Sequence, residues 1–276
     1  MNERFAVLSR LLLPAIALGL ITAAPAADVP KKVLLVGSPP DAHPVGTHEY
    51  LPGMQILAKC LKPVVGVEVT VATAEGAWKE GPDQIGRSDC VVLYLTEGAT
   101  WLSADAARLA AFRQLARRGG GLVCVHWGMG TREAGPIDAF VALFGGCHGG
   151  PDRKYQVVDA TVSVADRSHP IATELNDFKV HDEFYYRLKF PKGDGVRSIL
   201  RVPIDGKAET VAWAWERPDG GRSAGFSGLH FHENWKLPEY RRLMTQAVLW
   251  TTKLPVPSRG IRIELVDADF RLPPRK

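Results

Sequence analysis

The sequence predicts an α/β fold with a mostly parallel sheet covered on both faces, and with additional antiparallel or edge strands in the second half of the chain. In the first half, short runs that are apolar throughout alternate with segments whose apolar residues recur at helical spacing. This alternation is typical of buried parallel strands joined by crossover helices. In the second half, polar and apolar residues alternate, which is typical of strands with one wetter face.

Four buried strands and two helices are expected in the first half. One helix covers Tyr50–Leu61. A second begins at an N-cap, Ser103, and continues to Arg118, where three consecutive glycines end it. The strands are expected at residues 32–36, 67–71, 90–95 and 122–125.

The second half is expected to hold five further strands and a long helix at residues 238–252. After Leu254 the chain is rich in Pro and basic residues, and one short strand is expected at residues 261–266. No internal repeat or interdomain linker is visible, so a single domain over residues 28–254 with a tail at 255–276 is expected. The five strands are expected at residues 155–164, 184–188, 198–202, 210–215 and 222–227.

The first 27 residues have the layout of a secretory signal peptide. Arg4 and Arg10 precede an apolar run at residues 11–22, and small residues follow at 23–27. The run is short for a hydrocarbon core of about 30 Å, although an uncleaved membrane anchor is the alternative. We therefore expect a periplasmic or secreted protein with no stable membrane insertion after cleavage.

Charge and cysteine spacing exclude two classes of protein. The formal net charge is +4, and the Lys and Arg residues form pairs but no stripe with interleaved aromatic residues, so no nucleic-acid partner is expected. No CxxC metal pattern is present, and buried free thiols are the default interpretation of the cysteines. The four cysteines are Cys60, Cys90, Cys124 and Cys147.

Histidines follow several of the predicted strands. His43 and His48 come after the first strand, His126 follows the fourth directly, and His230 and His232 follow the strand at residues 222–227. Ligands of open parallel sheets bind beyond the carboxyl ends of the strands. Because imidazole is a common ligand of divalent metals, we expect His43, His48, His126 and one of His230 or His232 to share a metal site, with zinc as one candidate.

A dense polar cluster precedes the predicted strand at residues 184–188. His181, Asp182 and Glu183 are consecutive there. Paired carboxylates suit acid–base chemistry when one of them is desolvated, so these three residues are catalytic candidates. A solvated strand entrance is the alternative.

Six stretches of the chain, taken in order and spacing, carry a resemblance to a known family. They are residues 32–37, 112–128, 144–155, 166–175, 181–188 and 228–252. In these stretches the chain is similar to the ThuA-like (trehalose-utilisation) family, whose fold is related to that of the class I glutamine amidotransferases. The resemblance implies a flavodoxin-like, doubly wound sheet and a link to disaccharide or keto-sugar metabolism.

One position departs from the amidotransferase pattern. In those relatives a nucleophilic Cys occupies the sharp turn after the strand that matches residues 122–125. Here His126 follows that strand and Cys124 lies within it. A thiol that points into a packed sheet cannot reach a substrate and is not readily activated, so glutamine hydrolysis is not expected.

The resemblance, together with the expected metal site, implies an enzyme of carbohydrate metabolism that acts on a glycoside or keto-sugar. Its metal would polarise a sugar carbonyl or hydroxyl, leading to cleavage or isomerisation. Trp127, His148 and Tyr185 combine aromatic and polar groups and are the expected sugar-binding residues. The alternative is a non-catalytic carbohydrate-binding or accessory protein on the same fold. Metal content and turnover of keto-glycosides distinguish the two.

Overall fold

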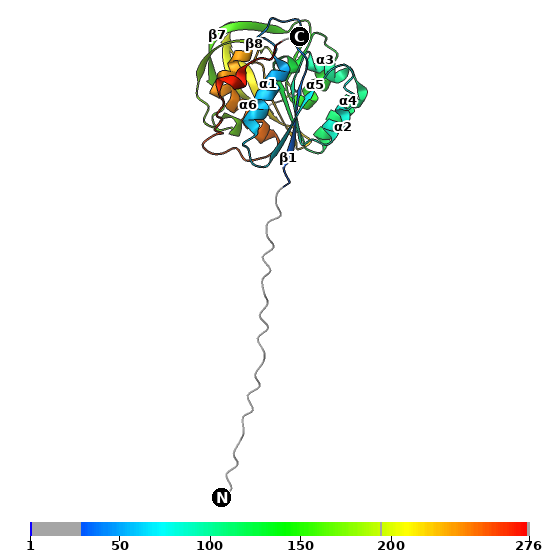
Figure 1. Cartoon of the computed structure of the whole chain (residues 1–276), viewed down its shortest axis with the longest axis vertical. Coiled ribbons are helices and arrows are strands. Elements are labelled where there is room, and N and C mark those ends of the chain that lie inside the picture. The colour runs from blue at the N-terminus through cyan, green and yellow to red at the C-terminus, as the bar shows by residue number, and fades with distance from the viewer. Residues whose placement is uncertain (2–28, 194, 275–276) are drawn as a thin grey trace.

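A nine-stranded sheet forms the centre of the protein (Figure 1). The structure is a computed structural model that describes residues 1, 29–193 and 195–274, so the predicted signal peptide, apart from Met1, lies outside the described residues. The strand order is β2-β1-β3-β4-β11-β10-β9-β7-β8. The first five strands pair in parallel in the flavodoxin-like order, and the other four join antiparallel. The fold class expected from the sequence is therefore confirmed.

The parallel part of the sheet is buried because helices cover both of its faces. All five residues of β3 and all five of β4 are buried. This explains why these segments are apolar throughout instead of alternating. The parallel strands are β1 (Lys31–Gly37), β2 (Val67–Thr73), β3 (Cys90–Tyr94), β4 (Gly121–Val125) and β11 (Arg222–Phe226).

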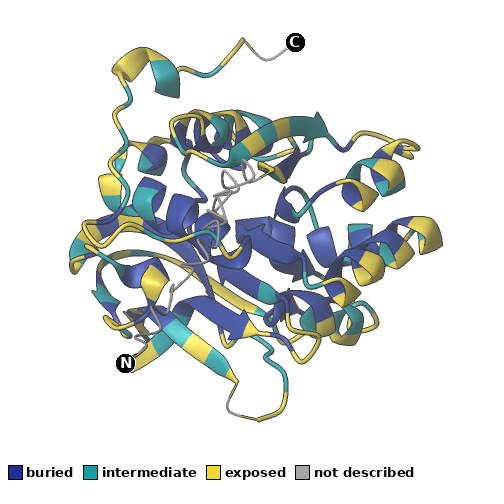
Figure 2. Ribbon diagram, turned by 90° about the horizontal axis from the view of Figure 1, so that it is seen from below, coloured by how far each residue is buried: buried dark blue, intermediate teal, exposed yellow. Residues whose placement is uncertain are grey.

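Helices α1 and α6 lie on one face of the sheet, and α2 to α5 lie on the other (Figure 1). The sides of the helices that face the sheet are buried; α2 and α4 expose their outer sides, whereas most of α6 is buried (Figure 2). The helices are α1 (Tyr50–Leu61), α2 (Gly81–Gly86), α3 (Gly98–Ser103), α4 (Ala106–Arg117), α5 (Ile137–Phe144) and α6 (Pro238–Thr251). Short 3-10 helices are η1 (His126–Met129), η2 (Pro170–Ala172), η3 (His232–Lys236) and η4 (Asp267–Phe270).

The helix expected to begin at Ser103 begins later. Ser103 is the last residue of α3, and α4 is capped by Asp105. The Asp105 carboxylate accepts a hydrogen bond of 2.7 Å from the backbone N–H of Arg108. This bond satisfies one of the amides that every helix start leaves open, so the carboxylate determines the boundary.

The antiparallel strands are longer than the alternation predicts. The strand expected at residues 184–188 is the end of β8, and its earlier residues pair with β7 in a regular register that includes His181 opposite Asp159. His181, Asp182 and Glu183 therefore lie inside a strand, not before one. The antiparallel strands are β7 (Lys154–Val164), β8 (Phe178–Tyr186), β9 (Val196–Ile204) and β10 (Lys207–Glu216); β5 (Gly130–Thr131) and β6 (His148–Gly149) form a separate pair.

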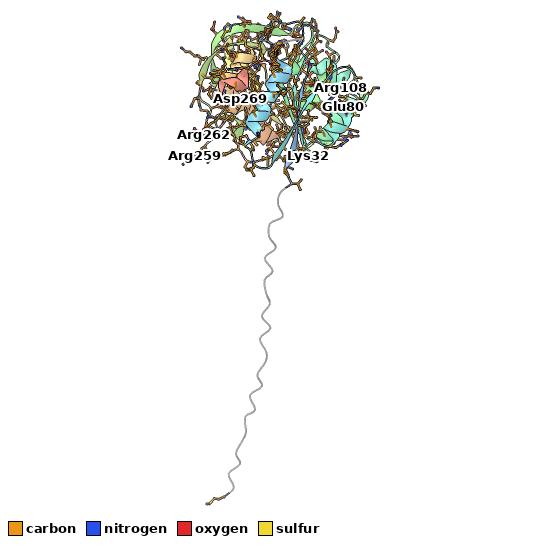
Figure 3. The ribbon with its side chains drawn as sticks, viewed as in Figure 1. Lys32, Glu80, Arg108, Arg259, Arg262 and Asp269 are labelled. Carbon is orange, nitrogen blue, oxygen red and sulfur yellow. The ribbon has the colours of Figure 1, made fainter. Side chains whose placement is uncertain are left out.

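The C-terminal segment packs against the domain but forms no strand at residues 261–266. No neighbouring strand pairs with it there; instead, the backbone N–H of Ile261 donates to the side chain of Gln246 at 3.1 Å. The carboxylate of Asp269 forms an ion pair of 2.8 Å with Lys59 of α1 (Asp269 is labelled in Figure 3). Within the described part of the chain, no helix is long and apolar enough to cross a membrane.

Candidate metal centre

Three histidines from three different loops meet beyond the carboxyl ends of β1, β4 and β11. The Nε2 atom of His126 lies 3.0 Å from Nε2 of His48 and 3.2 Å from Nδ1 of His230. His48 is on the loop after β1, His126 directly follows β4, and His230 is on the loop after β11. All three strands are parallel, so their carboxyl ends meet at one edge of the sheet.

Glu183 of β8 joins the three histidines. One oxygen of its carboxylate lies 3.7 Å from Nε2 of His126 and 3.5 Å from Nδ1 of His230. The four potential ligand atoms all lie within 4.8 Å of one another. Two ligand atoms that each lie about 2.0–2.1 Å from a tetrahedral ion are about 3.3 Å apart. These separations are close to that spacing, so the residues present fit a divalent ion.

Hydrogen bonds fix which nitrogen is free in two of the three imidazoles, those of His48 and His126. The Nδ1 atom of His126 lies 2.8 Å from the backbone oxygen of Ser227, and Nδ1 of His48 lies 3.0 Å from a carboxylate oxygen of Asp41. Both partners can only accept, so both Nδ1 atoms carry the proton. The Nε2 atoms that face each other therefore both present lone pairs, which is the arrangement found in metal-binding histidines.

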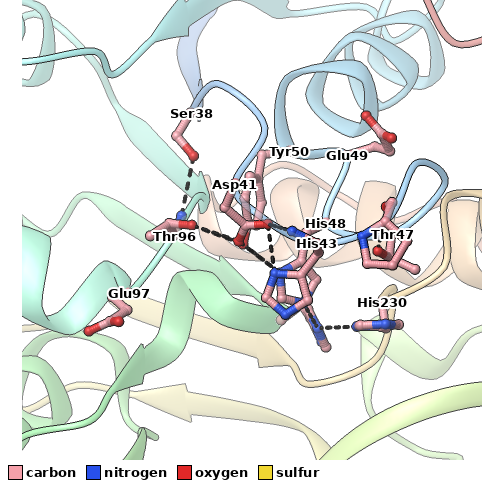
Figure 4. A network of polar contacts seen from close by, with 12 residues as sticks. Ser38, Asp41, His43, Thr47, His48, Glu49, Tyr50, Thr96, Glu97 and His230 are labelled. Atoms are coloured by element: carbon pink, nitrogen blue, oxygen red, sulfur yellow. Dashed lines mark hydrogen bonds and ion pairs between the residues drawn. The ribbon is translucent and has the colours of Figure 1, made fainter. Parts of the chain in front are cut away.

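Asp41 is held as an acceptor by several donors (Figure 4). The hydroxyls of Tyr50 and Thr96 donate to it at 2.6 Å and 3.0 Å, and the backbone N–H and Nδ1 of His43 lie at 3.0 Å and 2.7 Å. Partial burial raises the pKa of Asp41, but the hydrogen bonds from His48 and Tyr50 outweigh it and hold the pKa well below its usual range. Asp41 is therefore a carboxylate at neutral pH.

Burial keeps the three histidines neutral. It lowers the pKa of His126 well below 6.5, and the neighbouring histidines lower it further. Burial is also the largest cause of the lowered pKa of His48 and of His230, which falls to about 3. Metal binding requires neutral imidazole, so the burial favours the form that can act as a ligand.

The backbone around the cluster adopts conformations that side chains rarely tolerate. His48, His126 and Leu229, which precedes His230, have φ angles of 52°, 46° and 70°. Each such residue costs on the order of 1–3 kcal/mol, and strain of this kind concentrates at functional sites. The sharp turn at His126 continues through Gly128, where an added Cβ would lie 2.5 Å from the backbone oxygen of Leu93.

Two of the five candidate histidines are not part of the group formed by His48, His126, His230 and Glu183. His43 belongs to a second group with Asp41 and His48. The Nε2 atom of His232 lies 3.1 Å from the backbone oxygen of Phe270, because His232 begins η3 and its ring faces the C-terminal segment. The sequence left the choice between His230 and His232 open. In the structure, His230 is the one that lies next to His126.

The three consecutive catalytic candidates of β8 separate because side chains alternate across a strand. Glu183 faces the histidines, and burial, followed by the charge of Asp182, raises its pKa to about 7. Asp182 faces the opposite side, where it is fully buried and accepts hydrogen bonds from the backbone N–H groups of Leu229 at 2.7 Å and His230 at 3.1 Å. It thus shapes the loop that carries His230. His181 is exposed and pairs with Asp159 at 2.9 Å, outside the cluster.

The three residues expected to bind sugar lie together beside the cluster. The Tyr185 ring is stacked between His126, at 4.4 Å, and His148, at 3.9 Å, and Trp127 contacts its edge. The Tyr185 hydroxyl lies 3.0 Å from Nε2 of His126. A pocket of about 200 Å³ opens here. Its lining includes His48, Trp127, His148, Glu183 and Tyr185, together with two arginines described below.

The cysteines are free and buried, as the sequence suggested. Cys124 is fully buried inside β4, and burial raises its pKa well above the usual range. His126 occupies the turn directly after β4. The structure therefore offers no thiolate at the place where the amidotransferase relatives carry their nucleophile.

Solved structures with a similar fold include two ThuA-like proteins. One, from Bacteroides uniformis ATCC 8492, matches with a TM-score of 0.61 and 18% identity over 83% of this chain and 95% of its own. The other, from Parabacteroides merdae ATCC 43184, matches with a TM-score of 0.62 and 13% identity over 88% of this chain and 100% of its own. Gan42B, a GH42 β-galactosidase, matches with a TM-score of 0.51 and 13% identity over 82% of this chain and 30% of its own.

Sequence comparison agrees with this fold. No curated protein sequence matches the chain significantly. The family model for ThuA, described as trehalose utilisation, matches residues 42–251, a span that includes all four residues of the His/Glu cluster. By its sequence over most of its length, and in agreement with its fold, this chain belongs to the ThuA family.

Proposed function

We propose that this protein is an exported, metal-assisted enzyme that acts on a glycoside or keto-sugar. One observation carries the proposal: the Nε2 atoms of His48 and His126 lie 3.0 Å apart, and each ring carries its proton on Nδ1, which donates to an acceptor oxygen. Two lone pairs at this distance repel unless a proton or a cation lies between them.

A cation fits this gap better than a proton. Burial lowers the pKa of both imidazoles, so neither ring takes up a proton readily at neutral pH. His230 and Glu183 add two further ligand atoms on the same side. His48, His126 and His230 would hold the ion, and three histidines with one open position is a common arrangement of catalytic zinc.

The pocket supplies the other groups that the chemistry needs. A bound divalent ion polarises a carbonyl or hydroxyl oxygen. Glu183 lies next to the three histidines and is proposed as the general base. Burial raises its pKa to about 7 without an ion, and a bound divalent ion would lower it, so Glu183 would be a carboxylate able to accept a proton at neutral pH. It would take the proton from the carbon next to a sugar carbonyl, opening a route to glycosidic cleavage or isomerisation. Trp127 and Tyr185 would orient the sugar ring.

Turnover of keto-glycosides tests the proposal. The wild-type protein, prepared without chelators, is expected to convert the substrate, and removal of metal with a chelator is expected to abolish conversion until a divalent ion is returned. His232→Ala is the matched control, because His232 lies outside the cluster and its loss should leave turnover unchanged. A protein that binds sugars but converts none, with or without metal, would be a carbohydrate-binding protein instead.

Export is proposed from the first 27 residues of the sequence, with Arg4 and Arg10 ahead of the apolar run at residues 11–22. Mass spectrometry of the protein isolated from its native host is the test. The mature chain is expected to begin near Ala27 or Asp28. An intact N-terminal segment would contradict the proposal.

A further inference from the structure

We propose that the substrate carries an anionic group, a carboxylate or a phosphate, and that Arg153 at the mouth of the pocket binds it. This inference rests on the proposed function to the extent that the pocket beside the histidines is taken as the substrate pocket. It adds the chemical class of the substrate, an acidic sugar, and a residue that determines specificity.

Two arginines line the pocket, and they differ in whether their charge is already paired. Arg132 forms an ion pair of 2.8 Å with Glu97. Among the described residues, no carboxylate pairs with Arg153. The neighbouring Asp152 is held by Lys189 at 2.5 Å. Arg153 is therefore a cation in the lining of the pocket without a partner of opposite charge in the described part of the chain.

The loop between β6 and β7 holds Arg153 in place. The backbone N–H of Gly150 donates to the oxygen of Thr131 at 3.3 Å, which ties the loop to β5. Gly150 has a φ of +88°, and the backbone N–H of Arg153 returns to its oxygen at 3.3 Å. Nη1 of Arg153 donates to the same oxygen at 3.2 Å. These bonds restrict the arginine side chain, so binding an anion orders it at little further cost.

The rest of the lining offers Arg153 little competition for an anion. Glu183 is the single carboxylate among the described lining residues, and it faces the histidines, 3.7 Å from Nε2 of His126 and 3.5 Å from Nδ1 of His230. Burial, followed by the charge of Arg153, lowers the pKa of His148 to about 3, so His148 is neutral. A planar guanidinium with unused N–H donors matches a carboxylate or a phosphate, whereas a neutral sugar leaves its charge unpaired.

Calorimetry with the full chain tests this assignment. The probes are D-glucuronate, D-glucose 6-phosphate and D-glucose, each with the wild type, Arg153→Gln, Arg153→Lys and a control, Arg113→Gln. Arg113 is exposed on α4, on the covering layer of the sheet and not in the pocket lining. Arg153→Gln is expected to weaken binding of the preferred acidic sugar by about 10- to 100-fold. Binding of glucose should change less than about 2-fold, and Arg113→Gln should match the wild type.

Comparison of the two acidic probes shows whether the site prefers a carboxylate or a phosphate. Arg153→Lys keeps the positive charge but removes the planar guanidinium, so it shows which of the two properties binding requires. The inference is overturned if neither acidic sugar binds the wild type at 10 mM, or if Arg153→Gln binds them as tightly as the wild type. Metal content of the same preparations keeps this result distinct from the proposed function. If the protein holds no metal but binds acidic sugars through Arg153, the proposed metal-assisted function is wrong and the acidic ligand stands. If the protein holds metal but its binding does not depend on Arg153, the acidic ligand is wrong and the metal-assisted function stands.

Discussion

Substitution of Asp41 by Asn is expected to weaken metal binding although Asp41 does not belong to the His/Glu cluster. Asp41 accepts hydrogen bonds from the hydroxyls of Tyr50 and Thr96 and from Nδ1 of His48, so it is surrounded by donors. These three donors share one oxygen, Oδ2, and the backbone N–H and Nδ1 of His43 use the other, so an Asn must turn its NH₂ group toward one of the two sets of donors. Where the NH₂ group replaces Oδ2, His48 can avoid the clash by shifting its proton to Nε2, the atom that faces His126; where it replaces Oδ1, the negative charge that holds the proton on Nδ1 is still lost.

The loss can be estimated from the role of Asp41 as the partner that orients His48. Partners of metal-binding histidines typically contribute 10- to 100-fold to affinity, which corresponds to about 1.4–2.7 kcal/mol. The assay is competition for Zn²⁺ against a chromophoric chelator at pH 7.5. Thr96→Val is the matched control, because it removes one hydrogen bond to Asp41 but leaves the carboxylate, and its affinity should fall less than about 3-fold.

The result that would refute this reasoning is specific. If Asp41→Asn retains the fold, judged by circular dichroism and thermal melting, and binds Zn²⁺ within 2-fold of the wild type, then Asp41 does not set the proton position of His48. The facing Nε2 lone pairs would then have no structural cause, and the hydrogen-bond argument for the site would fail.

Three further predictions follow from the burial and position of single residues. Glu183→Gln should lower the turnover of a keto-glycoside by about 10²- to 10⁴-fold while metal content stays unchanged, since Glu183 is proposed as the base; loss of metal together with activity would make Glu183 a ligand instead. The pKa of His148 is about 3 in the folded protein, below its value of about 6.5 in the unfolded chain. Between these two pH values only the unfolded chain binds a proton at His148. The free energy of unfolding of the metal-free protein therefore falls as the pH drops through this window. From pH 7.5 to 5, His148→Gln should reduce this fall by about 2 kcal/mol in urea denaturation, and an unaltered pH dependence would contradict the neutral, buried state of His148. Ammonia release from glutamine should be undetectable in the wild type, and release that disappears in Cys124→Ser would show that the buried thiol is reachable after all.

Much of the fold could be predicted because its central strands are buried on both faces. Such strands must be apolar throughout, so β3 and β4 are visible as uninterrupted runs. Helix α1 matches the predicted Tyr50–Leu61 because its apolar spacing begins and ends clearly. The start of α4 was misplaced because Ser103 and Asp105 are both good N-caps, and only the chain path decides between them.

The site could be predicted in part for the same reason. His126 directly follows a buried strand, and parallel strands fix where that position lies. Asp41 was missed because nothing in the local sequence shows that the loop after β1 folds back to place Asp41 against His48 and Tyr50, or that Thr96, 55 residues further on, joins them. The roles of Asp182 and Glu183 depend on which face of β8 each residue occupies, and this register is set by pairing with β7, not by the local sequence.

Elemental analysis of purified protein tests the central claim most directly. The wild type, prepared from chelator-free buffers, is expected to contain about one equivalent of a divalent transition metal, bound by His48, His126 and His230. His230→Ala should lose most of it, whereas His232→Ala, a loss of the neighbouring histidine outside the cluster, should retain it. A wild type without stoichiometric metal, even after incubation with Zn²⁺ and gel filtration, or equal metal content in all three proteins, would contradict the account.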